Sequence, residues 1–272
     1  MSSYWLQVAT YFGIDSILAL GMYITLLSGQ VSLGHAGFMG IGAYTSAIIT
    51  AKMGLPFSLA LISGSLAGMF AALIIGLVMS KRLTGLYLAV GTLGFSEAMV
   101  IIWLNIDYVG GALGFSGIPL KANSIHIFFI LCLLILFFIG FENSKLSIAF
   151  RAISNDEGAA STSGINVTKN KILSLVIGGF ISGLGGCLFA HYIGMIQAED
   201  FSFERSISIL LGPIIGGRHI FLGSLIGSAI IVFTPELFRL QEKERFIIYG
   251  IVIVLIIIFR PTGLLPRKAF KR

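Results

Sequence analysis

The chain has 272 residues, of which 56% are hydrophobic and only 11% are charged. A soluble domain usually carries about 25% charged residues, so this composition excludes an ordinary soluble protein and indicates an integral membrane protein. Apolar runs of about 17–25 residues recur along the whole length, which predicts membrane-spanning helices rather than a β-barrel. The predicted fold class is all-α: residues 1–272 form a single polytopic helix bundle with about 8–10 transmembrane helices.

The apolar segments are taken in chain order. They cover roughly residues 5–28, 33–51, 55–80, 84–104, 125–142, 171–194, 204–217, 220–237 and 245–260. The first has neither a basic lead nor a small-residue cleavage site, so we do not expect a removable signal peptide. The segment 204–217 is the shortest and contains Gly212-Pro213, and the sequence leaves open whether it spans the membrane or re-enters it.

Basic residues are divided unevenly between alternate loops. The richer set is Lys81, Arg82, Lys145, Arg151, Lys169, Lys171, Arg218, Arg260, Arg267, Lys268, Lys271 and Arg272; the poorer set is Lys52, Lys121, Arg205, Arg239, Lys243 and Arg245. The positive-inside rule places the richer set in the cytoplasm, with the N-terminus outside and the C-terminus inside. The net charge of +6 is then a topology signal, and we expect no nucleic-acid partner.

The longest segment that is too polar for a membrane covers residues 142–171 and, in this orientation, faces the cytoplasm. Ser154 to Glu157 suggest a capping box, in which Ser154 accepts from the N–H of Glu157 and Glu157 reaches back to Ser154. Gly164, about two turns later, suits the left-handed residue that ends a helix. A short capped helix on the basic side of a membrane protein is a contact point for a soluble partner.

Small residues four apart form ladders in several apolar segments. The ladders are Gly64, Gly68, Ala72 and Gly76; Gly178, Ser182 and Gly186; and Gly223 and Gly227. Residues at this spacing line one helix face, so each ladder predicts a groove for a neighbouring helix. Two interpretations remain open: packing alone, or a smooth seam along which helices shift when a pathway opens.

Asp15 and Glu97 are the ionisable residues inside apolar runs. Charge is costly there, so such residues usually face the bundle interior and often mark a pathway. Asp15 is close enough to the outer end to reach the interface. Glu97 lies deeper, without an obvious Lys or Arg partner, and is either structural or part of a pathway.

No pattern of catalytic or metal-binding residues is found. His35 and His191 have no second ligand at metal spacing and no nucleophile partner, and Cys132 and Cys187 lie in apolar runs as packing residues. A phosphate-binding G-x-x-x-x-G-K-[ST] motif does not occur. We therefore expect a non-enzymatic chain with no cofactor or metal.

Four blocks of sequence carry a family resemblance. They are Leu27 to Phe38, continuing through Gly42-Ala43-Tyr44; Gly85 to Val90 with Thr92, Leu93 and Glu97; Arg151 to Asn166; and Phe259 to Leu265. Together these blocks span nearly the whole chain. By them the chain resembles the LivM-type permeases of branched-chain amino acid ABC importers. This family is an inner-membrane component of binding-protein-dependent transport systems.

The resemblance implies a role for the capped helix. In ABC importers a short cytoplasmic helix of the permease docks in a cleft on the ATPase, with the loose signature Glu-Ala-Ala, three residues, then Gly. This chain matches that signature with Gly158 inserted, which leaves the docking register open. The implied coupling residues are Ser154, Asp156, Glu157, Ala159, Ala160 and Gly164, and the candidates for pathway or helix packing are Gln30, His35, Gly37 and Glu97.

The resemblance also implies an activity and partners. The chain is expected to be a multi-pass permease subunit of the cytoplasmic membrane, in contact with lipid, that translocates leucine, isoleucine or valine. Its expected partners are a second homologous permease, two cytoplasmic ATPases and an extracytoplasmic binding protein. The alternatives are the same machine carrying urea or short amides, an ion-coupled secondary transporter using Glu97, and an intramembrane enzyme using His35 or His191.

Overall fold

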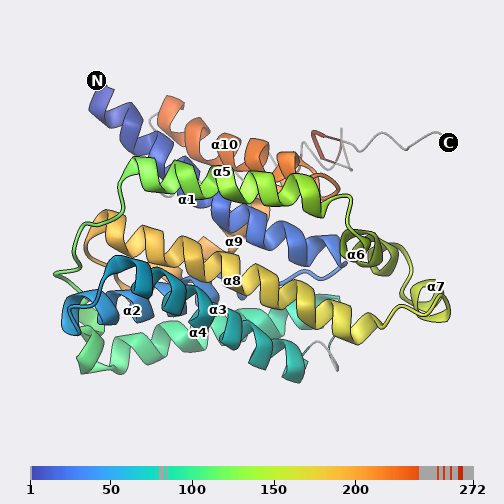
Figure 1. The fold of residues 1–272 in the computed structure, drawn as a ribbon, viewed down its shortest axis with the longest axis horizontal. Coiled ribbons are helices and arrows are strands. Elements are labelled where there is room, and N and C mark those ends of the chain that lie inside the picture. The colour runs from blue at the N-terminus through green and yellow to red at the C-terminus, as the bar shows by residue number, and fades with distance from the viewer. Residues whose placement is uncertain are drawn as a thin grey trace.

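The structure is a computed structural model that describes residues 2–79, 83, 85–238, 250, 254, 258 and 263–265. Within these residues every regular element is a helix, and an isolated antiparallel bridge joins Phe115 to Ile196. Figure 1 shows long helices lying side by side along one direction, with two short helices projecting at one end. The predicted all-α bundle is confirmed.

Most of the helices follow one another with short connections, and the longest, residues 106–123, joins α4 to α5. In chain order they are α1 (Ser2–Leu27), α2 (His35–Ala47), α3 (Phe57–Met79), α4 (Leu86–Asn105), α5 (Ser124–Phe141), α6 (Lys145–Asn155), α7 (Glu157–Thr162), α8 (Val167–Ile193), α9 (Phe203–Gly216) and α10 (Phe221–Phe238). Four short helical turns lie between them: η1 (Ile48–Lys52), η2 (Asp107–Val109), η3 (Gly111–Leu113) and η4 (Ala198–Phe201).

The first eight predicted apolar segments coincide with helices α1, α2 with η1, α3, α4, α5, α8, α9 and α10. Segment 245–260 falls almost wholly outside the described residues. Within the described part, α1, α3, α4, α5 and α8 are long and apolar enough to cross a membrane. Helix α9 has 14 residues and is therefore about 21 Å long, which is shorter than a hydrocarbon core of about 30 Å.

Helices α1 and α8 form the centre of the bundle. In their most apolar windows 83% and 72% of the residues are buried, against 22% for α5, 28% for α3 and 33% for α4. The outer helices expose large apolar side chains, such as Phe70 of α3, Val90 of α4 and Phe129 of α5. Exposed apolar side chains on spanning helices suit contact with lipid, because lipid chains are as apolar as the side chains themselves.

The glycine ladders pack helices at close range, as predicted. A Cβ atom added to Gly68 of α3 would lie 2.7 Å from the carbonyl oxygen of Gly179 in α8. One added to Gly178, on the opposite side of α8, would lie 2.8 Å from the carbonyl oxygen of Gly21 in α1. Only glycine permits these backbone-to-backbone approaches, so the ladders let α8 pack closely between α1 and α3.

Candidate functional site

The polar segment 142–171 contains two short helices where the sequence predicted one. Helix α6 begins after Ser144, whose Oγ accepts from the N–H of Ser147 at 3.2 Å. Helix α7 begins after Asp156, whose Oδ1 accepts from the N–H of Ala159 at 2.9 Å. The prediction that Ser154 is the cap is wrong: Ser154 lies in the last turn of α6. The extended backbone of Asp156 separates the two helices, and Asp is as good an N-cap as Ser.

Helix α7 ends as the sequence predicted. Gly164 has φ +84°, in the left-handed region, directly after the C-cap Ser163. The N–H of Ile165 donates to the carbonyl of Ala160 at 3.1 Å, and that of Gly164 to the carbonyl of Ser161 at 3.0 Å. This pair of bonds is the Schellman motif, which satisfies the last carbonyls of the helix.

Helix α6 is held firmly against the bundle by its apolar face. Phe150 and Ile153 are buried, and the ring of Phe150 packs against that of Phe141 at the end of α5. Arg151 donates from Nη1 to the carbonyl of Glu142 at 3.3 Å, and its Nη2 lies 3.7 Å from the Glu142 carboxylate.

Glu142 extends this attachment to two further helices. Its Oε1 accepts from the hydroxyl of Tyr23 in α1 and from the N–H of Phe221 in α10, each at 3.0 Å. A single carboxylate therefore joins the ends of α1, α5, α6 and α10. In the sequence Glu142 is marked only by its position at the end of an apolar run.

Helix α7 has much less contact with the bundle. Ala160 is its buried side chain, whereas Glu157 and Ala159 are exposed. Glu157 does not reach back to Ser154 as predicted; its Oε1 pairs with Nζ of Lys171 in α8 at 2.5 Å. The Lys171 side chain is 7% exposed, although the sequence suggested a loop lysine. The backbone N–H of Ser154 lies inside α6 and is not a free helix-start donor, whereas the Lys171 ammonium offers the carboxylate a charged partner.

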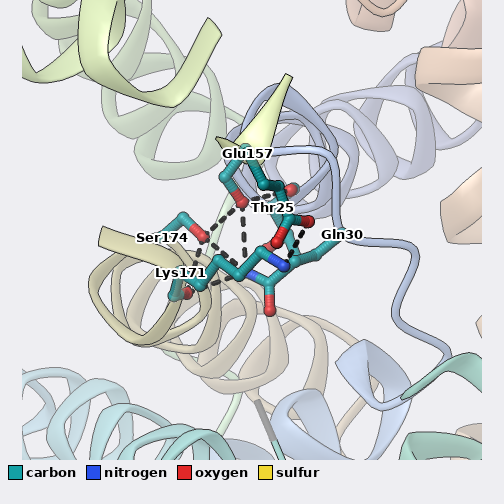
Figure 2. Close-up of polar contacts among 6 residues, drawn as sticks. Thr25, Gln30, Glu157, Lys171 and Ser174 are labelled. Carbon is teal, nitrogen blue, oxygen red and sulfur yellow. Dashed lines mark hydrogen bonds and ion pairs between the residues drawn. The ribbon is translucent and has the colours of Figure 1, made fainter. Parts of the chain in front are cut away.

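Gln30 lies directly beside Lys171, in the turn between α1 and α2. Its amide nitrogen donates to the Lys171 carbonyl at 2.8 Å and to the hydroxyls of Ser174 and Ser28 at 3.0 Å each. Figure 2 shows Thr25, Gln30, Glu157, Lys171 and Ser174 gathered at this point from α1, the α1–α2 turn, α7 and α8. Gln30 is thus buried and joins the α1–α2 turn to α8. Of the two roles considered for it, pathway or helix packing, these contacts fit helix packing.

His35 and Gly37 also serve helix contacts. His35 is fully buried at the start of α2, and its Nε2 lies 3.2 Å from the hydroxyl of Thr25. A Cβ on Gly37 would lie 2.9 Å from the ring of Phe95 in α4, so glycine lets α2 approach α4. Glu97 does not belong to this cluster; its Oε1 is buried and finds no hydrogen-bond partner in the part of the chain that the structure describes.

Half-way along α1 lies an ion pair that the sequence did not predict. Asp15 of α1 and Arg205 of α9 are 190 residues apart in the chain, and their side-chain atoms lie 2.6 Å apart. The sequence assigned Arg205 to an outer loop. No local pattern marks such a pair, because the partners meet only when α9 folds back along α1.

A cavity of about 460 Å³ surrounds this ion pair. Its charged lining residues are Asp15, Glu199, Asp200, Glu204, Arg205 and Glu236. Burial raises the pKa of the Asp200 carboxyl, while the N–H of Gln197 and the Arg205 charge oppose this shift. Among the described lining residues, five carboxyl groups against one guanidinium favour cations, such as an ammonium group, over anions.

The chain matches known proteins over nearly its whole length. Residues 4–259 match the family described as "Branched-chain amino acid transport system / permease component". The high-affinity branched-chain amino acid permease protein LivM of Salmonella typhimurium is 30% identical, over 96% of this chain and 69% of that protein. A probable branched-chain amino acid permease protein LivH of Methanocaldococcus jannaschii is 24% identical, over 94% and 88%.

Permeases named for another solute match as well. The ribose import permease protein RbsC of Bacillus subtilis is 26% identical, over 93% of this chain and 83% of that protein. No solved structure matches the chain. With its apolar helices and a family match over residues 4–259, the chain belongs to the branched-chain amino acid transport system permease family and is a multi-pass inner-membrane protein.

Proposed function

We propose that this chain is the transmembrane permease subunit of an ATP-driven ABC importer that translocates leucine, isoleucine or valine into the cell. The observation that carries this proposal is α7, an exposed helix with its own N-cap and Schellman end, projecting from one end of the bundle. The substrate class follows the names of the LivM and LivH relatives. Helix α7 is then the coupling helix that docks on an ATPase.

The partners follow from the same assignment. ATP hydrolysis is supplied by two separate cytoplasmic subunits, one docked on each permease, and an extracytoplasmic protein delivers the substrate. Because proteins named LivM and LivH both resemble this chain, the second permease is a homologue and the complex is a heterodimer in the membrane. The pathway lies between the two permeases, and affinity resides mainly in the binding protein.

The second candidate is the same machine carrying a different small solute. The similarity to a ribose permease favours this alternative, because one permease architecture then serves chemically different cargo. Urea and short amides belong to the same alternative. An ion-coupled secondary transporter is less well supported, because a proton relay uses several acids and Asp15 is already paired with Arg205.

The test is reconstitution of the permease with candidate ATPases, the second permease and the binding protein in proteoliposomes. Leucine-dependent ATP hydrolysis and ATP-dependent leucine uptake are expected, while an ATPase variant that binds but does not hydrolyse ATP abolishes uptake. Ribose and urea in place of leucine identify the alternative cargo. Uptake that persists without the ATPases and collapses with an uncoupler contradicts the importer.

A further inference from the structure

Helices α6 and α7 differ in how they are attached to the bundle. Helix α6 buries Phe150 and Ile153 and is bonded through Arg151 to Glu142. Helix α7 buries Ala160 and is joined to α8 by the Glu157–Lys171 ion pair. A helix with a small buried face moves at low cost, whereas α6 moves only with the bundle.

The position of Lys171 makes its ion pair more than a surface contact. Its side chain is 7% exposed, whereas that of Glu157 is 51% exposed. A buried ammonium that loses its partner is left uncompensated, and such losses are strongly destabilising. Displacement of Glu157 therefore either moves Lys171 with it or leaves the buried ammonium without its carboxylate.

The backbone carbonyl of Lys171 is also hydrogen-bonded, to residues outside α7. The carbonyl of Lys171 accepts from Gln30 at 2.8 Å and from the hydroxyl of Ser174 at 2.8 Å. The Ser174 hydroxyl lies 2.7 Å from that of Ser28. Lys171 is thus bonded through its side chain to α7 and through its backbone to the α1–α2 turn, as Figure 2 shows.

Helix α8 is well placed to carry a displacement into the membrane. It is one of the two central helices and packs against α1, α2 and α3. Its contacts with α3 and α1 involve Gly178, Gly179 and Gly183, which present backbone rather than interlocking side chains. Smooth faces of this kind oppose sliding less than interdigitated side chains do.

We propose that Glu157 and Lys171 form the link that transmits movement of α7 to α8, and through Gln30 to the α1–α2 turn. This inference rests on the proposed function, in which an ATPase moves α7. The two residues are positioning residues: they contact neither the cargo nor ATP. Their task is to convert a small displacement of an exposed helix into a displacement of a buried one.

The test uses the complete reconstituted importer with Lys171→Met, which keeps the apolar stem and removes the charge, and with Glu157→Gln. The Lys171→Met complex is expected to retain the ATPase on purification and to hydrolyse ATP at the wild-type basal rate. Glu157→Gln leaves the buried ammonium without its carboxylate, so its transport is compared per assembled complex. The leucine transported per ATP is expected to fall at least about fivefold, the lower end of the range for coupling between sites. A merely structural role leaves this ratio unchanged in the complexes that assemble.

Lys169→Met is the matched control. Lys169 lies two positions earlier in α8 and is exposed, so its replacement removes the same charge without touching the pair. The charge-reversed double variant Glu157→Lys with Lys171→Glu is expected to regain part of the transport that each reversal loses. Failure of the double variant to exceed both single reversals overturns the pair as the link.

Three results separate this inference from the proposed function. An unchanged ratio of leucine to ATP in Lys171→Met overturns the inference and leaves the importer intact. Loss of the ATPase from that variant on purification shows that the pair builds the docking surface, which also overturns the inference. A wild-type permease that binds no ATPase and shows no leucine-dependent hydrolysis overturns the proposed function itself, and the inference with it.

Discussion

Charged side chains inside the bundle are stabilised in different ways. Asp15 has a guanidinium partner in Arg205. Lys171 has a carboxylate partner in Glu157. Glu97 of α4 is partly exposed, and its buried Oε1 lacks a hydrogen-bond partner among the described residues. An acidic residue inside a membrane protein either serves the packing of the bundle or belongs to a pathway, and substitution separates the two roles.

Glu97→Gln is expected to leave ATP-driven uptake mostly intact. The amide has nearly the shape of the carboxyl group and removes only its ability to ionise, so a structural residue tolerates the change. The measurement is leucine uptake by the assembled complex at several external pH values, with wild type alongside. Complete loss of transport in a correctly assembled complex would show that Glu97 belongs to the pathway.

At the scale of elements, close helix packing depends on the absence of a side chain at a few positions. Gly68 lies where α3 meets α8, and a Cβ there would contact backbone at 2.7 Å. Gly140, near the end of α5, has nothing within 4 Å of the corresponding position. The two glycines are therefore a matched pair that differs in the presence of a neighbouring helix.

Gly68→Ala is expected to destabilise the protein by about 1–3 kcal/mol, the usual cost of overpacking, because backbone cannot give way as a flexible side chain can. Gly140→Ala is expected to leave stability unchanged or raise it slightly, since alanine favours the helix. Thermal unfolding of the purified protein in one detergent measures both. Equal melting temperatures for the two variants would contradict the packing argument.

The two alanines of α7 have different surroundings. Ala160 is buried against the bundle, so its replacement disturbs the permease itself, whereas Ala159 is exposed and available to a partner. Substitution of Ala159 therefore tests docking more cleanly than substitution of both residues. Asp156 and Glu157 add negative charge at the positive end of this helix, which stabilises it.

Ala159→Arg is expected to weaken co-purification of the ATPase and to lower uptake while leaving membrane insertion and yield unchanged. The bulky, charged arginine side chain is not expected to fit a cleft on the ATPase that accepts the small side chain of alanine. The control is Ala112→Arg, also an exposed alanine, in η3. Normal docking of the Ala159 variant would remove α7 from the contact with the ATPase.

At the scale of the whole molecule, the two ends of the bundle differ in chemistry. Figure 1 shows α6 and α7 at one end, where Lys145, Arg151, Lys169 and Lys171 are found. The acidic cavity around Asp15 and Arg205 lies among α1, η4, α9 and α10. The distribution of basic residues predicts that the α7 end is cytoplasmic.

Cysteine labelling tests this orientation. In a background without Cys132 and Cys187, Ser161→Cys in α7 is expected to react only when a membrane-impermeant reagent reaches the cytoplasmic side. Ser116→Cys, also exposed and in the segment between η3 and α5, is expected to react only from outside. The reverse pattern would put α7 beyond the reach of any ATPase and end the coupling proposal.

The sequence alone determined the class of fold, the position of eight helices and the family. Hydropathy is a local signal, because each spanning helix must satisfy its own backbone hydrogen bonds within about 20 residues. The end of α7 was also predictable, since Gly164 is a local stop signal. The division between α6 and α7 was not, because Ser154 and Asp156 are both good N-caps and the local pattern does not choose between them.

Only the tertiary structure decided which polar residues meet. Asp15 and Arg205 are 190 residues apart, and Gln30 contacts the backbone of a residue 141 positions away. Lys171 resembles a loop lysine in the sequence and is buried in the fold. Such pairs depend on how helices are arranged in three dimensions, and the cost of burying a charge becomes visible only when its neighbours are known.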